Sequence, residues 1–267
     1  MQKELAKIRI HFSKDVLENL YLRLNRRKFV HPDPLEFLYS YPDVRDREIA
    51  ALISSSLAYG RVAQILKSVG FVLNITEKPR EFVETRSLDS MRKAFKDFKH
   101  RFTTGEDIAL LLFSVKKIIE VHGSLEACFV SGVGKDDETV LPALKSFVRR
   151  LKRFGCKSGS AVLADPEKGS ACKRLNLFLR WMVREDGVDP GGWKDVSPSK
   201  LIIPLDTHMH SISIMLGLTE RKQANMFTAL EITDAFRKLC PDDPTKYDFC
   251  LTRYGIRDDL SLVVIDS

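Results

Sequence analysis

One segment decides how this chain folds: Leu201-Ile-Ile-Pro-Leu-Asp-Thr-His-Met-His-Ser-Ile-Ser-Ile-Met-Leu-Gly-Leu218. Its first apolar run ends at Pro204, and after Asp206 the apolar residues recur at helical spacing. Asp206 therefore stands where a helix N-cap belongs, because aspartate is favoured at that position. Backbone N–H groups and the helix dipole would both favour its ionised form. The segment predicts a fixed carboxylate at a helix start; a cap with no further role is the alternative interpretation.

Composition limits the class of protein. A chain of 267 residues can bury a sizeable core, as one large domain or as two intimate lobes. The net charge of +7 and the pI near 9.1 favour nucleic acid as a partner, although charge that only maintains solubility is the alternative. The N-terminus lacks a signal-peptide core, no apolar run is long enough for a membrane span, and the five cysteines include no C-x-x-C pair. We expect a reduced, cytoplasmic protein.

Helical periodicity runs through most of the chain and predicts an all-α fold. Asp43 should cap a helix that Gly60 closes, and Gly123 should end the helix that begins near Asp107. Further helices are expected over 1–30, 61–73, 139–154, 172–183, 227–239 and 243–254, with loops over 155–169 and 186–199. Only residues 260–265 resemble a strand.

Residues 91–102 interleave basic and aromatic side chains, as nucleic-acid surfaces do. However, Phe95, Phe98 and Phe102 recur at helical spacing, which is more typical of one buried helix face. We therefore expect all three rings in the core.

Two motifs resemble the helix-hairpin-helix DNA glycosylases, the superfamily of endonuclease III and the 8-oxoguanine DNA glycosylases. They are Gly169-Ser-Ala-Cys-Lys-Arg-Leu-Asn176 and Pro204-Leu-Asp-Thr-His208, and the resemblance covers roughly residues 45–256. The chain as a whole looks closest to an uncharacterised bacterial branch of that superfamily. The resemblance implies a two-lobed helical fold with a helix-hairpin-helix and a central cleft. It implies an N-terminal helical segment over 1–45, a glycosylase-like domain over 46–256 and a C-terminal tail over 257–267.

The resemblance also implies an activity, the excision of a damaged base, for which an oxidised purine is our expectation, with AP-lyase chemistry. Lys173 would attack the sugar C1′, and Asp206 would stabilise the cationic sugar. The implied DNA contacts are Gly169, Ser170, Ala171 and Arg174, and the implied pocket for the flipped base is lined by Ser54, Ser55, Tyr59, Trp193 and His208. We expect a monomer on double-stranded DNA, with no membrane contact.

The chain departs from the superfamily's pattern in two places. The stretch from Pro166 to Lys173 is longer than the compact hairpin of the superfamily, and the insertion between Lys173 and Asp206 is long, as in the archaeal 8-oxoguanine glycosylases. The four-cysteine motif of endonuclease III is missing, because only Cys250 lies near the last helix. We expect no iron–sulfur cluster, no metal and no other cofactor.

Two other functions remain open at this point. Asp206, His208 and His210 form a D-x-H-x-H pattern that a metal-dependent hydrolase could use, although His208 would point away from the other two on a helix. A catalytically silent nucleic-acid-binding protein of the same fold is the stronger alternative, because a fold does not imply chemistry.

Overall fold

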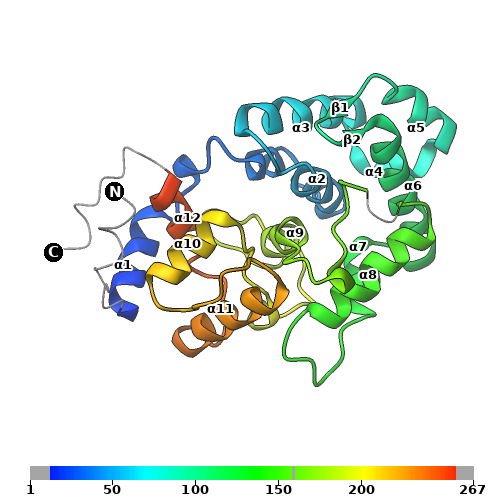
Figure 1. Cartoon of the computed structure of the whole chain (residues 1–267). Helices are drawn as coiled ribbons and strands as arrows, with labels where there is room; N and C mark the ends of the chain where they lie inside the picture. The colour runs from blue at the N-terminus through cyan, green and yellow to red at the C-terminus, as the bar shows by residue number, and fades with distance from the viewer. Residues whose placement is uncertain (1–12, 158–159, 257–267) are drawn as a thin grey trace.

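The computed structural model describes residues 13–157 and 160–256, and over these residues the chain is mainly helical (Figure 1). This confirms the prediction of a predominantly α-helical protein. The α-helices are α1 (Lys14–Leu24), α2 (Val44–Ser56), α3 (Val62–Thr76), α4 (Pro79–Thr85), α5 (Leu88–Ala94), α6 (Gly105–His122), α7 (Leu125–Val130), α8 (Leu141–Arg153), α9 (Lys173–Val183), α10 (Thr207–Met215), α11 (Met226–Leu239) and α12 (Asp248–Ile256). The 3-10 helices are η2 (Arg27–Phe29), η3 (Pro34–Ser40), η4 (Pro166–Lys168) and η5 (Pro198–Lys200). The expected strand at 260–265, the C-terminal tail and residues 1–12 lie outside the described part of the chain.

Helix starts follow the capping residues that the sequence indicates. Asp43 accepts from the Arg45 N–H at 2.6 Å and caps α2, and Asp206 caps α10, as predicted. Gly123 ends α6 with a φ of +84°, a conformation that favours glycine. These boundaries depend on neighbours within a few residues, which is why the sequence could place them.

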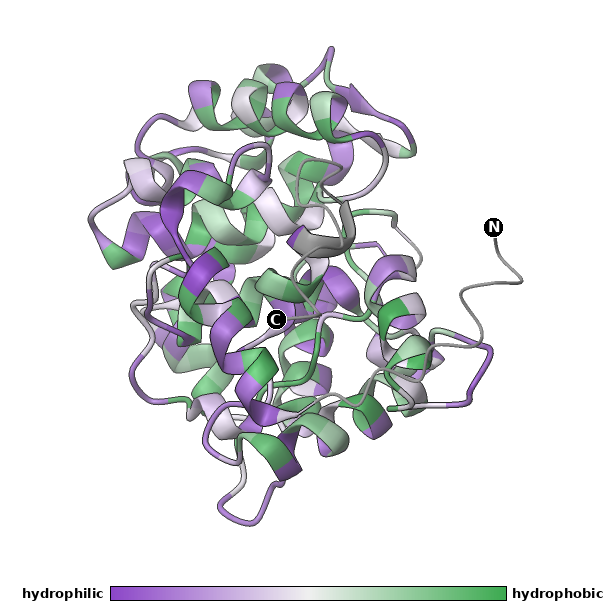
Figure 2. Cartoon of the chain, turned by 90° about the vertical axis from the view of Figure 1, so that its left-hand side faces the viewer, coloured by the Kyte–Doolittle hydropathy of each residue, from purple (hydrophilic) through white to green (hydrophobic). Residues whose placement is uncertain are grey.

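Helix α9 lies at the centre of the molecule, where it packs against α2 (Figure 1). On the side of α9 away from α2, α10 packs against α12. Helix α12 also packs against α1, so the first and last described helices are in contact. One cluster of buried apolar side chains connects these layers, from Leu17 in α1 to Leu251 in α12. Figure 2 shows the corresponding pattern, with apolar and polar residues alternating along most helices.

A short β-hairpin replaces part of an expected helix. Helix α5 ends at Ala94, and β1 (Lys99–His100) pairs antiparallel with β2 (Thr103–Thr104). The prediction that three phenylalanines share a buried face was therefore wrong for one of them, because Phe102 is 74% exposed while Phe95 and Phe98 are buried.

The break comes from the residues that begin α6. Thr104 and Asp107 form a reciprocal capping box, which fixes a helix start directly after the hairpin. Gly105 touches the Phe95 carbonyl so closely that a Cβ there would lie 1.7 Å from its oxygen. The chain must therefore reverse before Gly105, and helix α5 cannot continue through the hairpin.

Two further features differ from the predicted helices. Helix α7 was not expected; its first turn is held by Ser124 and by the buried Glu48, whose carboxylate accepts from the N–H groups of Leu125 and Glu126 at 3.1 Å each. The last helix begins later than predicted. Asp243 makes a turn with Thr245 and does not cap a helix, and α12 begins at Asp248.

No helix in the described residues has the length and apolar character needed to cross a membrane.

Glu48 provides a test of this packing. Its carboxylate is buried and also accepts from the Trp193 indole N–H at 3.0 Å. Glu48→Ala would leave three buried donors without an acceptor, so we expect the free energy of unfolding to fall by about 3 kcal/mol or more. Urea unfolding measures the change. Glu120→Ala, which removes an exposed ion pair with Lys117, should cost less than about 0.5 kcal/mol. Equal losses in the two variants would contradict this account.

Candidate active site

Asp206 lies where the chain passes from a buried segment into α10. The preceding residues, from Leu201 to Leu205, are all buried. The Asp206 backbone is extended, with φ −117° and ψ −173°, and one carboxylate oxygen, Oδ1, accepts from the Met209 N–H at 2.8 Å. Capping uses Oδ1, and the second oxygen, Oδ2, remains available for another partner.

That partner is Lys173, the first residue of α9. Its Nζ lies 3.0 Å from Asp206 Oδ2, although 33 positions separate the two residues in the sequence. The Lys173 side chain is 34% exposed and the Asp206 side chain 20% exposed, so solvent reaches the pair. The structure thus brings together the two residues that the sequence analysis singled out as catalytic candidates.

The surroundings of Asp206 keep it charged. Burial alone would raise the pKa of this carboxyl, but the Lys173 ammonium, the Met209 N–H and the neighbouring His208 together hold the pKa below its usual value of 3.8. Asp206 is therefore an anion near neutral pH. It suits the stabilisation of positive charge and is a weak proton acceptor.

Arg180 in α9 and Arg184 directly after it anchor the helix that carries Lys173. Arg180, seven residues on, lies on the same helix face. It pairs with Asp248 of α12, and its Nη2 lies 3.2 Å from Asp189 Oδ1. Arg184 pairs with Asp189 as well, and its Nε lies 2.7 Å from an Asp243 oxygen. The sequence gives little sign of this cluster: only two arginines four residues apart, at Arg180 and Arg184, within and just after a mainly apolar stretch.

Arg174 is partly buried and contacts the end of α2. Its guanidinium donates to the carbonyls of Ser56 and Ala161 and lies 4.9 Å from the centre of the Tyr59 ring. Burial lowers the pKa of this guanidinium from its ordinary value. The Nη1 donors of Arg174 are thus engaged by protein carbonyls, and contact of this residue with DNA phosphates stays a prediction.

Three of the expected pocket residues lie in or just after α2, where Ser54 and Ser55 belong to the helix and Tyr59 follows it. Tyr59 contacts the Arg174 guanidinium directly, and its hydroxyl lies 2.8 Å from the His100 carbonyl oxygen. Ser54 and Ser55 are buried, and Ser55 donates to the Leu52 carbonyl. The Ser54 hydroxyl has no hydrogen-bond partner among the described residues. Ser54 and Ser55 are thus closed off from solvent in this conformation.

Trp193 is a clear correction. The sequence analysis placed it in the substrate pocket, but it is only 1% exposed and donates to Glu48. Its ring packs against Phe129 and Phe178 in the core. The Gly/Pro-rich segment around Trp193 therefore folds inward, because a large indole with a paired N–H is stabilised by burial.

The loop before α9 carries the expected phosphate-binding residues. Gly169 has φ +75° and is exposed, as is Ser170, while Ala171 is buried. The Gly169 carbonyl accepts from Met226 N–H at 3.1 Å, which attaches this loop to the start of α11. Cys172, the N-cap of α9, makes no side-chain capping bond. The loop therefore presents Gly169 and Ser170 to solvent next to Lys173.

The D-x-H-x-H pattern does not assemble into a metal centre. His208 is exposed, and His210 Nε2 lies 2.8 Å from the Arg221 carbonyl oxygen. Among residues 13–157 and 160–256, no three His, Cys, Asp or Glu side chains are grouped so as to hold a metal ion. The geometry thus gives no support to the hydrolase interpretation.

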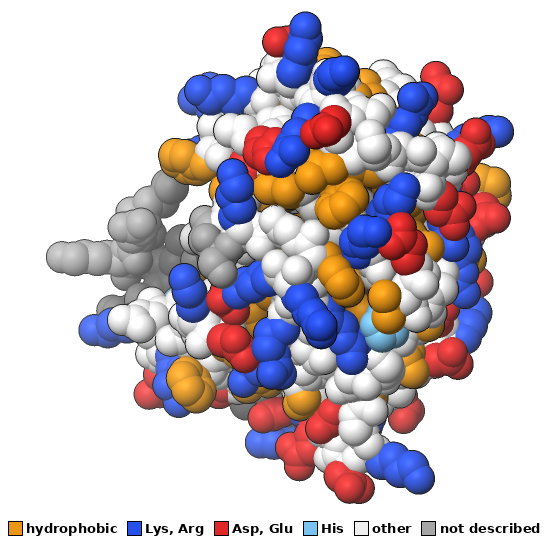
Figure 3. All heavy atoms as spheres, turned by 90° about the vertical axis from the view of Figure 1, so that its right-hand side faces the viewer, with side chains coloured by type: hydrophobic (Ala, Val, Ile, Leu, Met, Phe, Trp, Pro, Cys, Tyr) orange, Lys and Arg blue, Asp and Glu red, His pale blue; other side chains and the backbone are white. Residues whose placement is uncertain are grey.

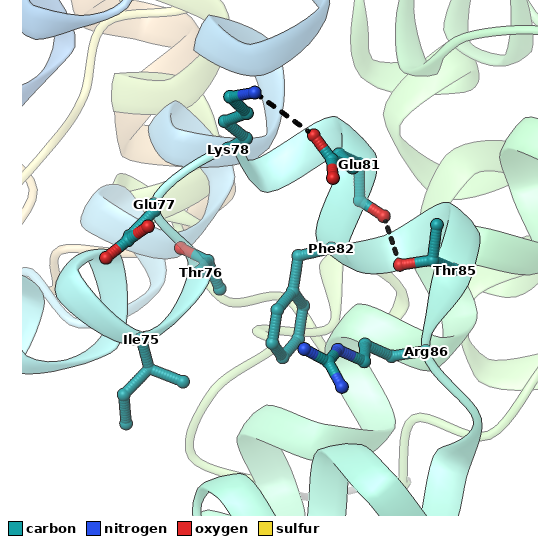
Figure 4. Close-up of a pocket in the computed structure, with 8 residues that line it drawn as sticks. All are labelled: Ile75, Thr76, Glu77, Lys78, Glu81, Phe82, Thr85 and Arg86. Carbon is teal, nitrogen blue, oxygen red and sulfur yellow. Dashed lines mark hydrogen bonds and ion pairs between the residues drawn. The ribbon is translucent and has the colours of Figure 1, made fainter.

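A hollow of about 230 Å³ lies away from the candidate site, between the end of α3 and α4 (Figure 4). Lys78 Nζ is 3.4 Å from Glu81, and Arg86 lies over the Phe82 ring. The hollow shares no lining residue with the candidate site, and its cations already have partners.

Comparison with known proteins identifies the family. The family model described as "Protein of unknown function (DUF2400)" matches residues 33–257, and the chain belongs to this family. No curated protein and no solved structure matches the chain.

The double role of Asp206 generates a stability prediction. Asp206→Asn keeps a good N-cap but removes the charge, so the free energy of unfolding should fall by about 1 kcal/mol or less at neutral pH. Asp206→Ala also removes the cap and should cost about 1 kcal/mol more. Because the Asp206 pKa is lower in the folded state, the ionic contribution is present above pH 3.8 and is lost as the pH falls through the folded-state pKa. Urea titrations at several pH values measure both effects; an Asn variant as unstable as the Ala variant would contradict the capping role.

Proposed function

We propose that this chain is a DNA glycosylase with AP-lyase activity that removes a damaged base, with an oxidised purine as the substrate class. The fold we propose for it is the two-lobed helix-hairpin-helix architecture with a central cleft. One observation carries the proposal: an amine and an ionised carboxylate, 33 residues apart, meet at 3.0 Å where solvent can reach them. Base excision through a covalent sugar intermediate needs a nucleophile and an anion close together at an accessible site.

In the proposed reaction the Lys173 ammonium first releases a proton to water, which the one-third exposure of its side chain permits. The Nζ lone pair then bonds to the sugar C1′ while the C1′–base bond breaks, and the base leaves with that electron pair and takes up a proton. The sugar ring opens to a Schiff base on Lys173. Loss of a proton from C2′ and departure of the 3′ phosphate cleave the strand, and water releases the amine.

Asp206 would act on the charge that develops in this sequence. As the base departs, positive charge builds on the sugar, and a carboxylate fixed by the α10 backbone stabilises it without having to reorganise. The lowered pKa of Asp206 supports this electrostatic role over that of a general base. The cap also fixes Oδ2 beside Lys173, which keeps the amine oriented.

The proposed partner is double-stranded DNA, with the damaged nucleotide flipped out of the helix. The net charge of +7 supports a polyanionic ligand. Exposed Gly169 and Ser170, beside the uncapped start of α9, are suited to a backbone phosphate. The face in Figure 3 intersperses basic and acidic side chains, so the positive charge is not concentrated there.

Covalent trapping with borohydride tests the nucleophile. Borohydride reduces a Schiff base to a stable amine, so the wild-type protein should form an adduct with a duplex carrying one substrate lesion, found with a panel that includes oxidised purines. Lys173→Ala should abolish the adduct and leave duplex affinity within about twofold. Asp206→Asn should slow base release by about 100-fold or more while the protein stays folded. Lys168→Ala, which removes an exposed lysine from the same loop, is the matched control and should form the adduct normally.

Two results would overturn this proposal. An adduct that persists in Lys173→Ala would place the nucleophile elsewhere. DNA binding without an adduct or base release on any lesion would favour the catalytically silent nucleic-acid-binding protein.

Salt dependence tests the proposed partner separately. If several phosphates are neutralised on binding, the logarithm of the association constant should fall linearly with the logarithm of salt concentration, with a slope of about −0.9 per phosphate contact. Fluorescence anisotropy with a labelled duplex over a range of salt concentrations gives this slope. An affinity that does not change with salt would exclude a duplex DNA substrate.

A further inference from the structure

The tip of the β-hairpin carries an aromatic ring that the fold leaves uncovered. Phe102 is 74% exposed and is the most exposed large apolar side chain among residues 13–157 and 160–256. It belongs to the stretch in which the sequence interleaves basic and aromatic residues. One exposed ring is ordinary on a protein surface, so the neighbouring side chains decide whether Phe102 belongs to a contact surface.

The hairpin is held firmly beneath this ring. The buried His100 ring has one nitrogen 2.9 Å from the Ser68 hydroxyl of α3 and the other 3.0 Å from the Tyr59 carbonyl oxygen. The Tyr59 hydroxyl in turn lies 2.8 Å from the Thr103 hydroxyl. Because both strands are tied to neighbouring elements, the fold fixes the hairpin that presents Phe102.

A second exposed ring lies on the adjoining surface of α3. Phe71 is 45% exposed and stacks on Phe98, with ring centres 5.7 Å apart and planes 29° from parallel. These two rings, with Lys67 and Lys99, help to line a hollow of about 130 Å³. Asp97 also lines the hollow, and its carboxylate is paired with Lys96. The two rings could stack with a nucleobase, and the two lysines could contact its phosphate.

The charges on this surface point to the same kind of ligand. Lys67, Lys99 and Arg101 are exposed, and within the described part of the chain none of them forms an ion pair with a carboxylate. The nearby Lys96 is paired with Asp97 at 3.9 Å. The Arg101 guanidinium carbon lies 5.7 Å from the centre of the Phe102 ring, so this cation and this ring form one polar–aromatic pair at the surface. Proteins hold single-stranded nucleic acid with cations and aromatic rings of this kind, by contacting phosphates and stacking on bases.

We propose that this surface, the α3–hairpin face (Lys67, Phe71, Lys99, Arg101 and Phe102), binds an unpaired segment of a DNA strand. The inference rests on the proposed function for its choice of DNA as the polymer. The face is also connected to the candidate site, since Tyr59 supports the hairpin on one side and contacts Arg174, next to Lys173, on the other.

Fluorescence anisotropy with two labelled duplexes tests the proposal, one fully paired and one with a bulge of about six unpaired nucleotides. Phe102→Ala and Phe71→Ala should each weaken binding to the bulged duplex about tenfold, which is the usual effect of losing one base–aromatic stack, and should change binding to the paired duplex less than about twofold. Lys99→Glu should weaken binding to both and reduce the salt slope. Leu22→Ala, at an apolar residue 66% exposed on α1, and Lys238→Glu, at an exposed lysine of α11, are matched controls that should bind both duplexes normally.

The proposal fails if Phe102→Ala binds the bulged duplex as tightly as the wild-type protein, or if it loses affinity equally for both duplexes. Borohydride trapping with the same variants tests the glycosylase proposal independently of DNA binding at this face. Selective loss of bulged-duplex binding in a protein that never forms an adduct would support this face and reject the lyase. An adduct in variants whose binding to the bulged duplex is unchanged would support the lyase and reject this face.

Discussion

The buried ion pairs of α9 are the interaction on which the rest of this structure depends. The side chains of Arg180 and Arg184 are each only 4% exposed, and Asp189, which pairs with both, is fully buried. Charges removed from water in this way are tolerated only when they are paired and hydrogen-bonded. Removing one member would leave an uncompensated buried charge, at a cost of about 3–5 kcal/mol. The network therefore requires the segment around Asp189 and helix α12 to take up one arrangement around α9.

That arrangement also positions the candidate site. Arg180 lies two helical turns beyond Lys173 and reaches Asp248 of α12, and α12 packs against α10, which Asp206 caps. Burial raises the pKa of Asp248 to about 6, in contrast to the lowered pKa of the more accessible Asp206. The pKa values of these two carboxyl groups are thus shifted in opposite directions. The one beside Lys173 remains ionised near neutral pH.

The sequence predicts this structure well where a few neighbouring residues decide it. The cap at Asp43, the helix end at Gly123 and the cap at Asp206 all follow from local chemistry. No local pattern shows that Lys173 and Asp206, 33 positions apart, will meet. Their approach was expected only from the family resemblance.

The errors arose where distant residues decide the outcome. Trp193 lies in a Gly/Pro-rich stretch that resembles a surface insertion, yet its N–H finds Glu48, 145 positions away. Phe102 fits a helical period, but the capping box after it and the tight approach of Gly105 to Phe95 produce a hairpin. The sequence also gives no sign that the Arg174 guanidinium reaches Ser56 across the interface between α9 and α2.

Because Asp206 caps a helix, the presence of an aspartate at this position in other family members has two possible explanations. A carboxylate that begins a helix would be retained by folding alone, even in a descendant that had lost its chemistry. Lys173 makes its ion pair at the edge of the protein and caps nothing, so the fold places far less demand on it. Under the proposed function, the lysine would therefore be more informative than the aspartate about which relatives carry the chemistry.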